Sequence, residues 1–211
     1  NILTQKMALE VLSHKSFGNH RIFANYCIRH KPLIYPKPAE SRTMGFLQYN
    51  ADKYVISNHS GQKAVTGQST NTGKTLFSDV GMTKGNRYEW SIYITKFKGN
   101  PWVSFGMDVL TQDRINSSSH CGHYSRHSYG ADVDDTSFHF YRNQSQTHSG
   151  SGGVKAGTKI SFLYNAAEGI LRVFANRQQS WMFTGIETEN IFYPSFKTNS
   201  NCTFLVSDVR V

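Results

Sequence analysis

Four side chains that could ligate a metal lie close together in one polar stretch of the chain. His120, Cys121, His123 and His127 form an H-C-x-H-x3-H pattern. Imidazole nitrogen and thiolate sulfur are donors that zinc prefers. However, the neighbouring residues are Ser, Gly and Asn, and no second cysteine pair occurs elsewhere to complete a site. We therefore expect a polar loop here, with no metal and no other cofactor.

Other catalytic patterns are incomplete in this chain. A histidine near a cysteine can activate the thiol as a nucleophile, but no motif around Cys121 supports that role. Asp132, Asp134 and Asp135 resemble half of a calcium loop that lacks the required Gly and terminal Glu. Neither GxxxxGK[ST] nor GxGxxG is present. Because no acids or nucleophile are paired at a readable spacing, we predict a protein that is not an enzyme.

The segments that would position any site are strands. Residues 159–165 and 169–176 alternate apolar and polar side chains on either side of a short Gly-containing loop, which predicts a hairpin. Residues 86–97 place Tyr88, Trp90, Ile92 and Ile94 on one face. Shorter strands are predicted over residues 45–50, 53–57, 75–79, 102–110, 128–131, 138–141, 181–183 and 191–196.

Two stretches have no periodicity and are predicted to be loops. Residues 111–127 read as a long loop, and 143–157 as a flexible segment of Ser, Gly, Gln, Asn, Thr and His. No convincing long helix interrupts the strands, so the fold class is all-β, an antiparallel β-sandwich over 43–211. Residues 1–42 are expected to form a basic N-terminal extension, a short helix followed by a Pro-containing strap.

The net charge and the number of cysteines indicate which partners and which cell compartment to expect. Lys and Arg number 23 against 14 acids, a net charge of +9, which favours anionic partners. The three cysteines cannot all pair, which indicates a reducing, intracellular compartment without distinguishing cytoplasm, nucleus and mitochondrion. No apolar run approaches the ~20 residues that cross a bilayer, so no membrane partner is expected.

Several segments, taken in order, resemble one family. Gly85-Asn86-Arg87-Tyr88-Glu89-Trp90 is similar to a Gly-x-x-Tyr-Trp-Glu strand, Trp102–Met107 to the strand after it, and Ser128-Tyr129-Gly130 to a Ser-Tyr-Gly segment. Residues 169–176 with Phe183 are similar to a Gly-x-Leu-x-Phe-x-x-Asn-Gly hairpin, and Tyr193-Pro194-Ser195-Phe196 to a Tyr-Pro-x-Phe strand. Over residues 45–209 the chain resembles the SPRY domain family. It departs in the Tyr-Glu-Trp order and in having Arg177 where the hairpin has Gly.

The resemblance implies a bent, concanavalin-like β-sandwich that recognises a protein or peptide through loops at one end. Those loops vary among members, so no contact residue transfers by motif. From this chain alone we expect polar loops with embedded aromatic and basic anchors to bind the partner. The candidates are Asn58, Lys63, Trp102, Tyr124, Arg126, His127, Arg142, Arg177 and Trp181.

Two other functions stay open. An RNA-associated factor would use a basic face for phosphate contacts, and its binding would weaken steeply with salt. A lectin-like sandwich that binds carbohydrate rests on shape analogy alone.

Overall fold

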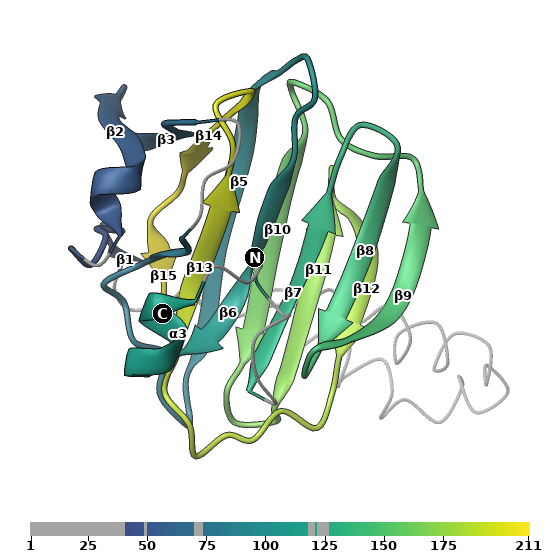
Figure 1. Cartoon of the computed structure of the whole chain (residues 1–211). Coiled ribbons are helices and arrows are strands. Elements are labelled where there is room, and N and C mark those ends of the chain that lie inside the picture. Colours follow the sequence, from purple (N-terminus) through teal and green to yellow (C-terminus); the bar gives the residue numbers. More distant parts are fainter. Residues whose placement is uncertain (1–40, 49, 70–73, 118–120, 122–126) are drawn as a thin grey trace, which may run out of the picture. The chain divides into compact units, whose positions relative to one another are not determined.

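The computed structural model describes residues 41–211, apart from 49, 70–73, 118–120 and 122–126, and it omits the side chains of 41 and 179. Two antiparallel β-sheets pack face to face (Figure 1). The larger, nine-stranded sheet has the central order β12 (Gln178–Phe183), β11 (Ile170–Ala175), β10 (Lys159–Asn165), β5 (Arg87–Phe97), β14 (Cys202–Val206), β3 (Gln62–Gly67), β2 (Tyr54–His59). Two short strands, β1 (Ser41–Arg42) and β15 (Val209–Arg210), pair with each other, and β15 also pairs with β5.

The second sheet has six strands and carries most of the loops discussed below. Its order is β4 (Leu76–Phe77), β13 (Phe192–Thr198), β6 (Val103–Val109), β7 (Ser128–Val133), β8 (Ser137–Arg142), β9 (Ser145–Ser151). The described residues also contain a short 3-10 turn, η2 (Ala51–Lys53), and one short helix, α3 (Gln112–Asn116). The expected all-β sandwich is confirmed.

Strand alternation builds the core between the sheets. Tyr88, Trp90, Ile92 and Ile94 of β5 are all buried, as the alternating pattern predicts. The Trp90 ring stacks on Phe162 of β10, its register partner, at a centroid distance of 4.9 Å. The predicted hairpin over 159–176 is also confirmed, because β10 and β11 pair along their whole length.

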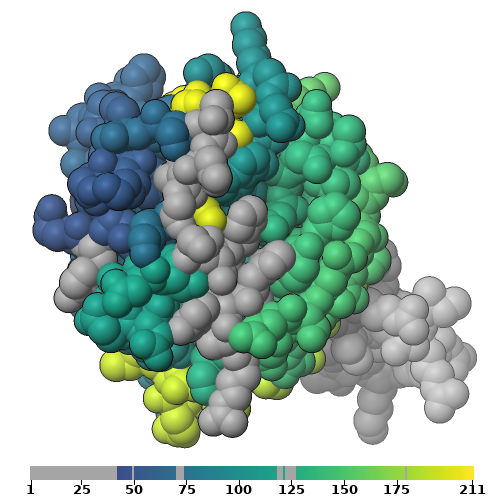
Figure 2. Space-filling model, viewed as in Figure 1, coloured from purple at the N-terminus to yellow at the C-terminus, as the bar shows by residue number. Residues whose placement is uncertain are grey.

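The prediction of a flexible loop over 143–157 is wrong for residues 145–151, which form β9. Asn143 and Gln144 have φ of 53° and 73°, the left-handed pair of a two-residue hairpin turn. Strand β9 is the last strand of its sheet, and its side chains are exposed or half-exposed. Because neither face of β9 is buried, its polar side chains show no alternation (Figure 2 shows this side of the molecule in green).

The structure differs from the sequence prediction at three further places. The turn after β11 takes only Asn176 and Arg177, with φ of 48° and 72°, so β12 begins at Gln178. Over 45–50 the structure has an isolated bridge from Phe46 to Ser78 in place of the predicted strand. Ser41 and Arg42, assigned to the extension from sequence, pair with β15. The rest of that extension lies outside the described residues.

Antiparallel pairing separates the connections into two groups. Asp108 pairs with Ser128 and Val109 with Phe192, so the β6–β7 and β12–β13 connections lie at the same end of the sandwich. Residues 78–86 and the turn 143–144 lie at that end too, and we call it the long-loop end. Because Tyr93 pairs with Lys159 and Phe97 with Cys202, residues 98–102, 152–158, 176–177 and 199–201 lie at the other, short-loop end. These two names are used below.

We predict that Phe162→Ala lowers the free energy of unfolding by about 3–5 kcal/mol, since it leaves a cavity beneath Trp90. The measurement is urea unfolding followed by tryptophan fluorescence. Ser161→Ala, one position away on the outward face of the same strand, is the matched control and should change stability by less than about 0.5 kcal/mol. Equal losses in both variants would contradict the assignment of Phe162 to the core.

Candidate recognition surface

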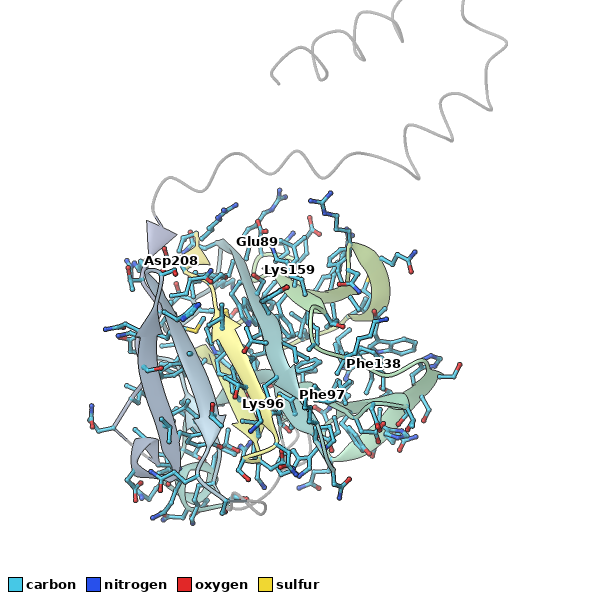
Figure 3. All side chains as sticks on the ribbon, turned by 90° about the horizontal axis from the view of Figure 1, so that it is seen from above. Glu89, Lys96, Phe97, Phe138, Lys159 and Asp208 are labelled. Carbon is cyan, nitrogen blue, oxygen red and sulfur yellow. The ribbon has the colours of Figure 1, made fainter. Side chains whose placement is uncertain are left out.

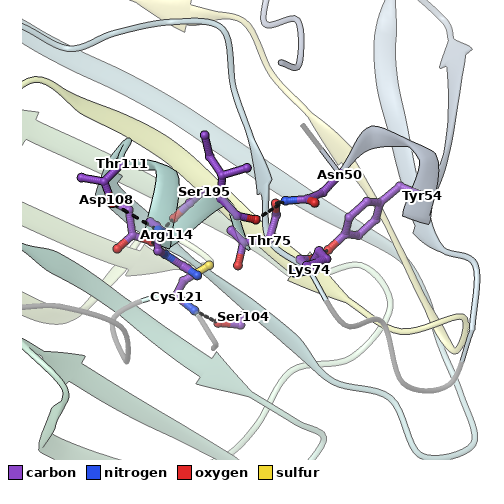
Figure 4. A network of polar contacts seen from close by, with 11 residues as sticks. Asn50, Tyr54, Lys74, Thr75, Ser104, Asp108, Thr111, Arg114, Cys121 and Ser195 are labelled. Carbon is purple, nitrogen blue, oxygen red and sulfur yellow. Dashed lines mark hydrogen bonds and ion pairs between the residues drawn. The ribbon is translucent and has the colours of Figure 1, made fainter. Parts of the chain in front are cut away.

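A buried ion pair fixes the start of the β6–β7 connection against the outer face of the six-stranded sheet (Figure 4). Arg114 of α3 donates from Nη2 and Nε to Asp108 Oδ2 of β6, at 2.9 and 3.2 Å. Both side chains are 1% exposed. Ser195 Oγ of β13 donates to the same carboxylate oxygen at 3.2 Å, and the guanidinium lies 5.5 Å from the Phe77 ring centroid. Three strands and the helix therefore converge on one charge pair.

The same connection lies close against the sheet further along. The backbone N–H of Cys121 donates to Ser104 Oγ at 2.8 Å. A side chain at Gly130 would meet the Cys121 carbonyl oxygen at 3.0 Å and the Phe105 carbonyl oxygen at 2.5 Å. The glycine of the Ser-Tyr-Gly segment is therefore needed because backbone crosses directly over it.

Helix α3 has polar anchors at both ends. Thr111 accepts a hydrogen bond from the Arg114 N–H at 3.1 Å, as an N-cap should. At the other end, Asn50 Nδ2 donates to the Ile115 carbonyl at 2.9 Å, and Lys74 Nζ donates to the Asn116 carbonyl. These contacts satisfy carbonyls that a helix of this length cannot pair internally.

Arg142 ties three elements together at the long-loop end. It is the last residue of β8, and its guanidinium lies 5.8 Å from the ring centroid of Tyr129 on β7. Its Nη2 donates to the Gly185 carbonyl in the β12–β13 connection at 3.1 Å. Burial raises the pKa of Tyr129, and the neighbouring Arg142 charge opposes that rise. The phenol is therefore neutral at physiological pH, and its buried ring packs beneath a fixed cation.

A second polar group lies on the same end. His127 Nδ1 is 3.4 Å from Glu187 Oε2 and 3.3 Å from Asn190 Nδ2. Asn190 Nδ2 also donates to Glu187 Oε2 at 3.3 Å. The next residue, Ile191, is 47% exposed, one of four exposed large apolar side chains among the described residues. Residues 127, 142, 185, 187, 190 and 191 are called the candidate recognition surface below.

The predicted partner-binding residues are distributed over several places. His127 and Arg142 come together on the candidate recognition surface. Trp102 and Arg177 lie at the short-loop end, where the Lys197 ammonium is 5.7 Å from the Trp102 ring centroid. The remaining described candidates lie apart from both groups: Asn58 and Lys63, hydrogen-bonded at 2.8 Å beside the β2–β3 turn, and Trp181 on β12, stacked 4.4 Å from His148 of β9.

Tyr124, Arg126, His120 and His123 lie outside the described residues, so their predicted roles stay predictions. Cys121 is fully buried, and burial together with the Asp108 carboxylate raises the pKa of its thiol to about 11. A neutral buried thiol is a poor metal ligand. Asp134, weighed as a calcium ligand, accepts hydrogen bonds from Thr136 and Ser137. No cluster of three metal-binding side chains occurs in the part of the chain that the structure describes.

Sequence reasoning missed Gly185, Glu187, Asn190 and Ile191. They lie between two predicted strands in a stretch with no motif and no aromatic residue before Phe192. Ile191 had been assigned to the following strand, which begins one residue later. The one available signal was an isoleucine beside a charged, turn-forming segment, which sequence alone does not separate from a strand end.

Comparison with solved structures identifies the architecture. The TRIM65 PSpry domain matches with a TM-score of 0.59 and 16% identity, over 79% of this chain and 92% of that one. The SPRY domain of human HERC1 matches with a TM-score of 0.52 and 18% identity, over 78% and 98%. The chain has the SPRY fold.

A carbohydrate recognition domain, that of Emp46p, shares the sandwich, with a TM-score of 0.53 and 12% identity over 80% of this chain and 87% of that one. No protein-family model matches the sequence, and no curated protein does. The family resemblance read from short motifs is thus confirmed at the level of the fold, in a SPRY-type sandwich whose sequence has diverged.

We predict that Arg114→Met lowers the free energy of unfolding by about 3–5 kcal/mol, because it leaves the Asp108 carboxylate buried without its cation. The double variant Asp108→Leu/Arg114→Met should recover a large part of that loss. Urea unfolding of the two single variants and the double variant gives the coupling. Strictly additive losses would show that the two side chains act independently.

Stability should also depend on alkaline pH through Cys121. Its folded-state pKa of about 11 lies above the value near 8.5 expected in an unfolded chain. Stability is therefore complete below about pH 8.5 and falls as pH rises towards 11. The urea midpoint of the parent should decline over this window, and the decline should be shallower in Cys121→Ala. An identical pH slope in the two proteins would contradict the burial of this thiol.

Proposed function

We propose that this chain is a non-enzymatic recognition module whose long-loop end binds a protein or peptide. The observation that carries the proposal is the convergence of β8, β7 and the β12–β13 connection on Arg142, with the buried Tyr129 ring beneath the guanidinium and Gly185 bonded to it. Arg is a preferred interface anchor, and these two contacts hold its side chain in place.

The rest of the candidate recognition surface fits such a partner. Ile191 offers an exposed apolar contact, and Glu187 and Asn190 offer an acceptor and a donor beside it. A central apolar contact with a polar surround is the usual anatomy of a protein interface. The SPRY fold supports the proposal, since the resemblance implies protein ligands bound by loops at one end.

The cellular setting is part of the proposal. Cys121 and Cys202 are both free and buried, which suits the reducing, intracellular compartment expected from the odd cysteine count. Among the described residues, no helix combines the length and apolarity that crossing a membrane requires.

Peptides selected on the chain from a phage-displayed random library should bind at the candidate recognition surface. With a fluorescein-labelled selected peptide, anisotropy should show that Arg142→Ala and Ile191→Asp each weaken binding about thirtyfold or more, as loss of an interface anchor does. Arg177→Ala, which removes one positive charge at the short-loop end, is the control for Arg142→Ala and should bind like the parent.

Unfolding midpoints of all three variants separate loss of binding from loss of fold. If folded Arg142→Ala and Ile191→Asp bind the peptide as tightly as the parent does, the proposed surface is wrong.

A further inference from the structure

Positive charge collects at the end of the sandwich opposite the candidate recognition surface. Lys96 is the penultimate residue of β5 and Lys98 follows the strand, Lys155 precedes β10 and Lys159 begins it, and Arg177 occupies the β11–β12 turn. All five side chains are exposed. Figure 3 shows Lys96 and Glu89 towards opposite ends of β5. We call these five residues the basic rim.

Few acids lie near the basic rim. Residues 94–102, 152–160, 175–178 and 198–203 contain no Asp or Glu. Among the described residues, none of the five cations forms an ion pair, and Lys96 Nζ instead donates to the Ser200 carbonyl at 2.9 Å. Of the acids elsewhere at this end, Asp52 pairs with Lys53, and Asp134 accepts from Thr136 and Ser137. Asp135 is exposed in the turn between β7 and β8, beside the backbone of Gly153, and the five cations outnumber these acids.

The long-loop end differs in this respect. There, Lys84 pairs with Glu189, and Arg210 is the register partner of Glu89. Asp79, Asp113, Glu168, Glu187 and Asp208 are also distributed among the cations of that end. Residues 41–211 contain 17 Lys and Arg and 12 Asp and Glu, a net charge of +5, and the cations of the basic rim form part of that excess.

Strand register places an exposed aromatic ring within the basic rim. Tyr93 is 44% exposed on the outward face of β5, and its partner on β10 is Lys159. The Lys159 N–H donates to Asn176 Oδ1, and the Asn176 N–H donates to the Lys159 carbonyl. Arg177 follows immediately, so a guanidinium, an ammonium and a phenol ring occupy adjacent strand positions.

A bulge in β5 adds Lys96 to the same face. The pairing with β14 shifts between Thr203 and Phe204, so Ile94 and Phe97 both pack towards the core. Lys96 remains exposed opposite Thr203, on the outward side with Tyr93. The Thr95 and Thr203 hydroxyls bond within the sheet: Thr95 Oγ1 donates to the Thr203 carbonyl at 3.2 Å, and Thr203 Oγ1 lies 2.8 Å from Thr66 Oγ1.

We propose that the basic rim and Tyr93 bind single-stranded nucleic acid. Clustered cations that outnumber the acids near them repel one another, and phosphates relieve that repulsion by replacing bound counterions. An exposed ring on a flat sheet face offers a base a stacking surface that is independent of sequence. The site is separate from the candidate recognition surface, so one can fail without the other.

The side chains of the basic rim favour nucleic acid over a lipid surface. Membrane-binding patches combine cations with protruding apolar side chains that enter the headgroup region. Of the turns at this end, Lys155-Ala156-Gly157 and Asn176-Arg177 carry no large apolar side chain. Trp102, in the connection over 98–102, is half-buried, with the Lys197 ammonium 5.7 Å from its ring centroid. Tyr93 lies on the strand itself, suited to stacking against a base.

The test is anisotropy of a fluorescein-labelled, mixed-sequence RNA of about 20 nucleotides, titrated at salt concentrations from about 50 to 200 mM. The parent should bind at low salt and weaken steeply as salt increases. The variant Lys155→Gln/Lys159→Gln/Arg177→Gln should bind at least tenfold more weakly at low salt. Its slope of log affinity against log salt should be smaller by about 2, since each lost phosphate contact contributes about 0.7.

The matched control is Arg42→Gln/Arg87→Gln/Arg210→Gln, which removes three charges from the long-loop end. Because the two triple variants have the same net charge, only the location of the charge distinguishes them. The control should keep the affinity and the salt slope of the parent. If both triple variants weaken alike, binding follows net charge and the site is wrong.

A second variant tests the ring. Tyr93→Leu should reduce affinity by about tenfold, the loss of one stacked base, while leaving the salt slope unchanged. Unaltered affinity in this variant, together with equal binding of a duplex of the same length, would overturn the single-stranded assignment.

Vesicles of phosphatidylcholine with about 30% phosphatidylserine provide the remaining comparison. Binding to these vesicles without binding to RNA would assign the basic rim to a membrane surface and overturn the proposal, as would absence of RNA binding at about 50 mM salt.

Discussion

The long-loop end depends on one buried charge pair. Asp108 and Arg114 lie on the outer face of a sheet, where solvent would normally surround them, and the β6–β7 connection covers them. Taking both ions out of water costs several kcal/mol, and only close geometry and further hydrogen bonds offset that cost. Ser195 and the Phe77 ring supply these contacts. A pair with such demands permits few arrangements of helix α3, which carries Arg114, against β6 and β13.

The fold was predictable wherever burial imposes a period on the sequence. Strands β5, β10 and β11 each bury alternate side chains, and the sequence shows this as apolar residues at alternate positions. Strand β9 buries almost nothing, so its sequence reads as a loop although its backbone pairs with β8 throughout. The two-residue turn before β9 was missed, and the turn over 176–179, which the sequence does predict, is shorter than expected, so β12 begins at Gln178. Asn-Gln and Asn-Arg lack the glycine that usually marks a two-residue turn.

The sites were less predictable, because they assemble from residues distant in sequence. Composition singled out Arg142 and His127, while their neighbours Gly185 and Glu187 gave no local signal. A lone acid in the apolar strand WVSFGMDV was a sign that a buried partner had to exist, yet nothing local identified Arg114. Charge counts gave +9 but not its distribution, which required the register of β5 against β10.

The pairing of β1 with β15 has a mechanical consequence. The strand that enters the sandwich and the strand that leaves it lie side by side, with Ser41 opposite Arg210 and Arg42 opposite Val209. Tension applied between the two ends would load these pairs one after another, as in opening a zipper, instead of shearing them together. The seam at β1 would therefore part under a small force while the longer ladders around β5 stayed closed. A protein that carries this domain between two tethered neighbours could thus lose its first strand long before it loses its fold.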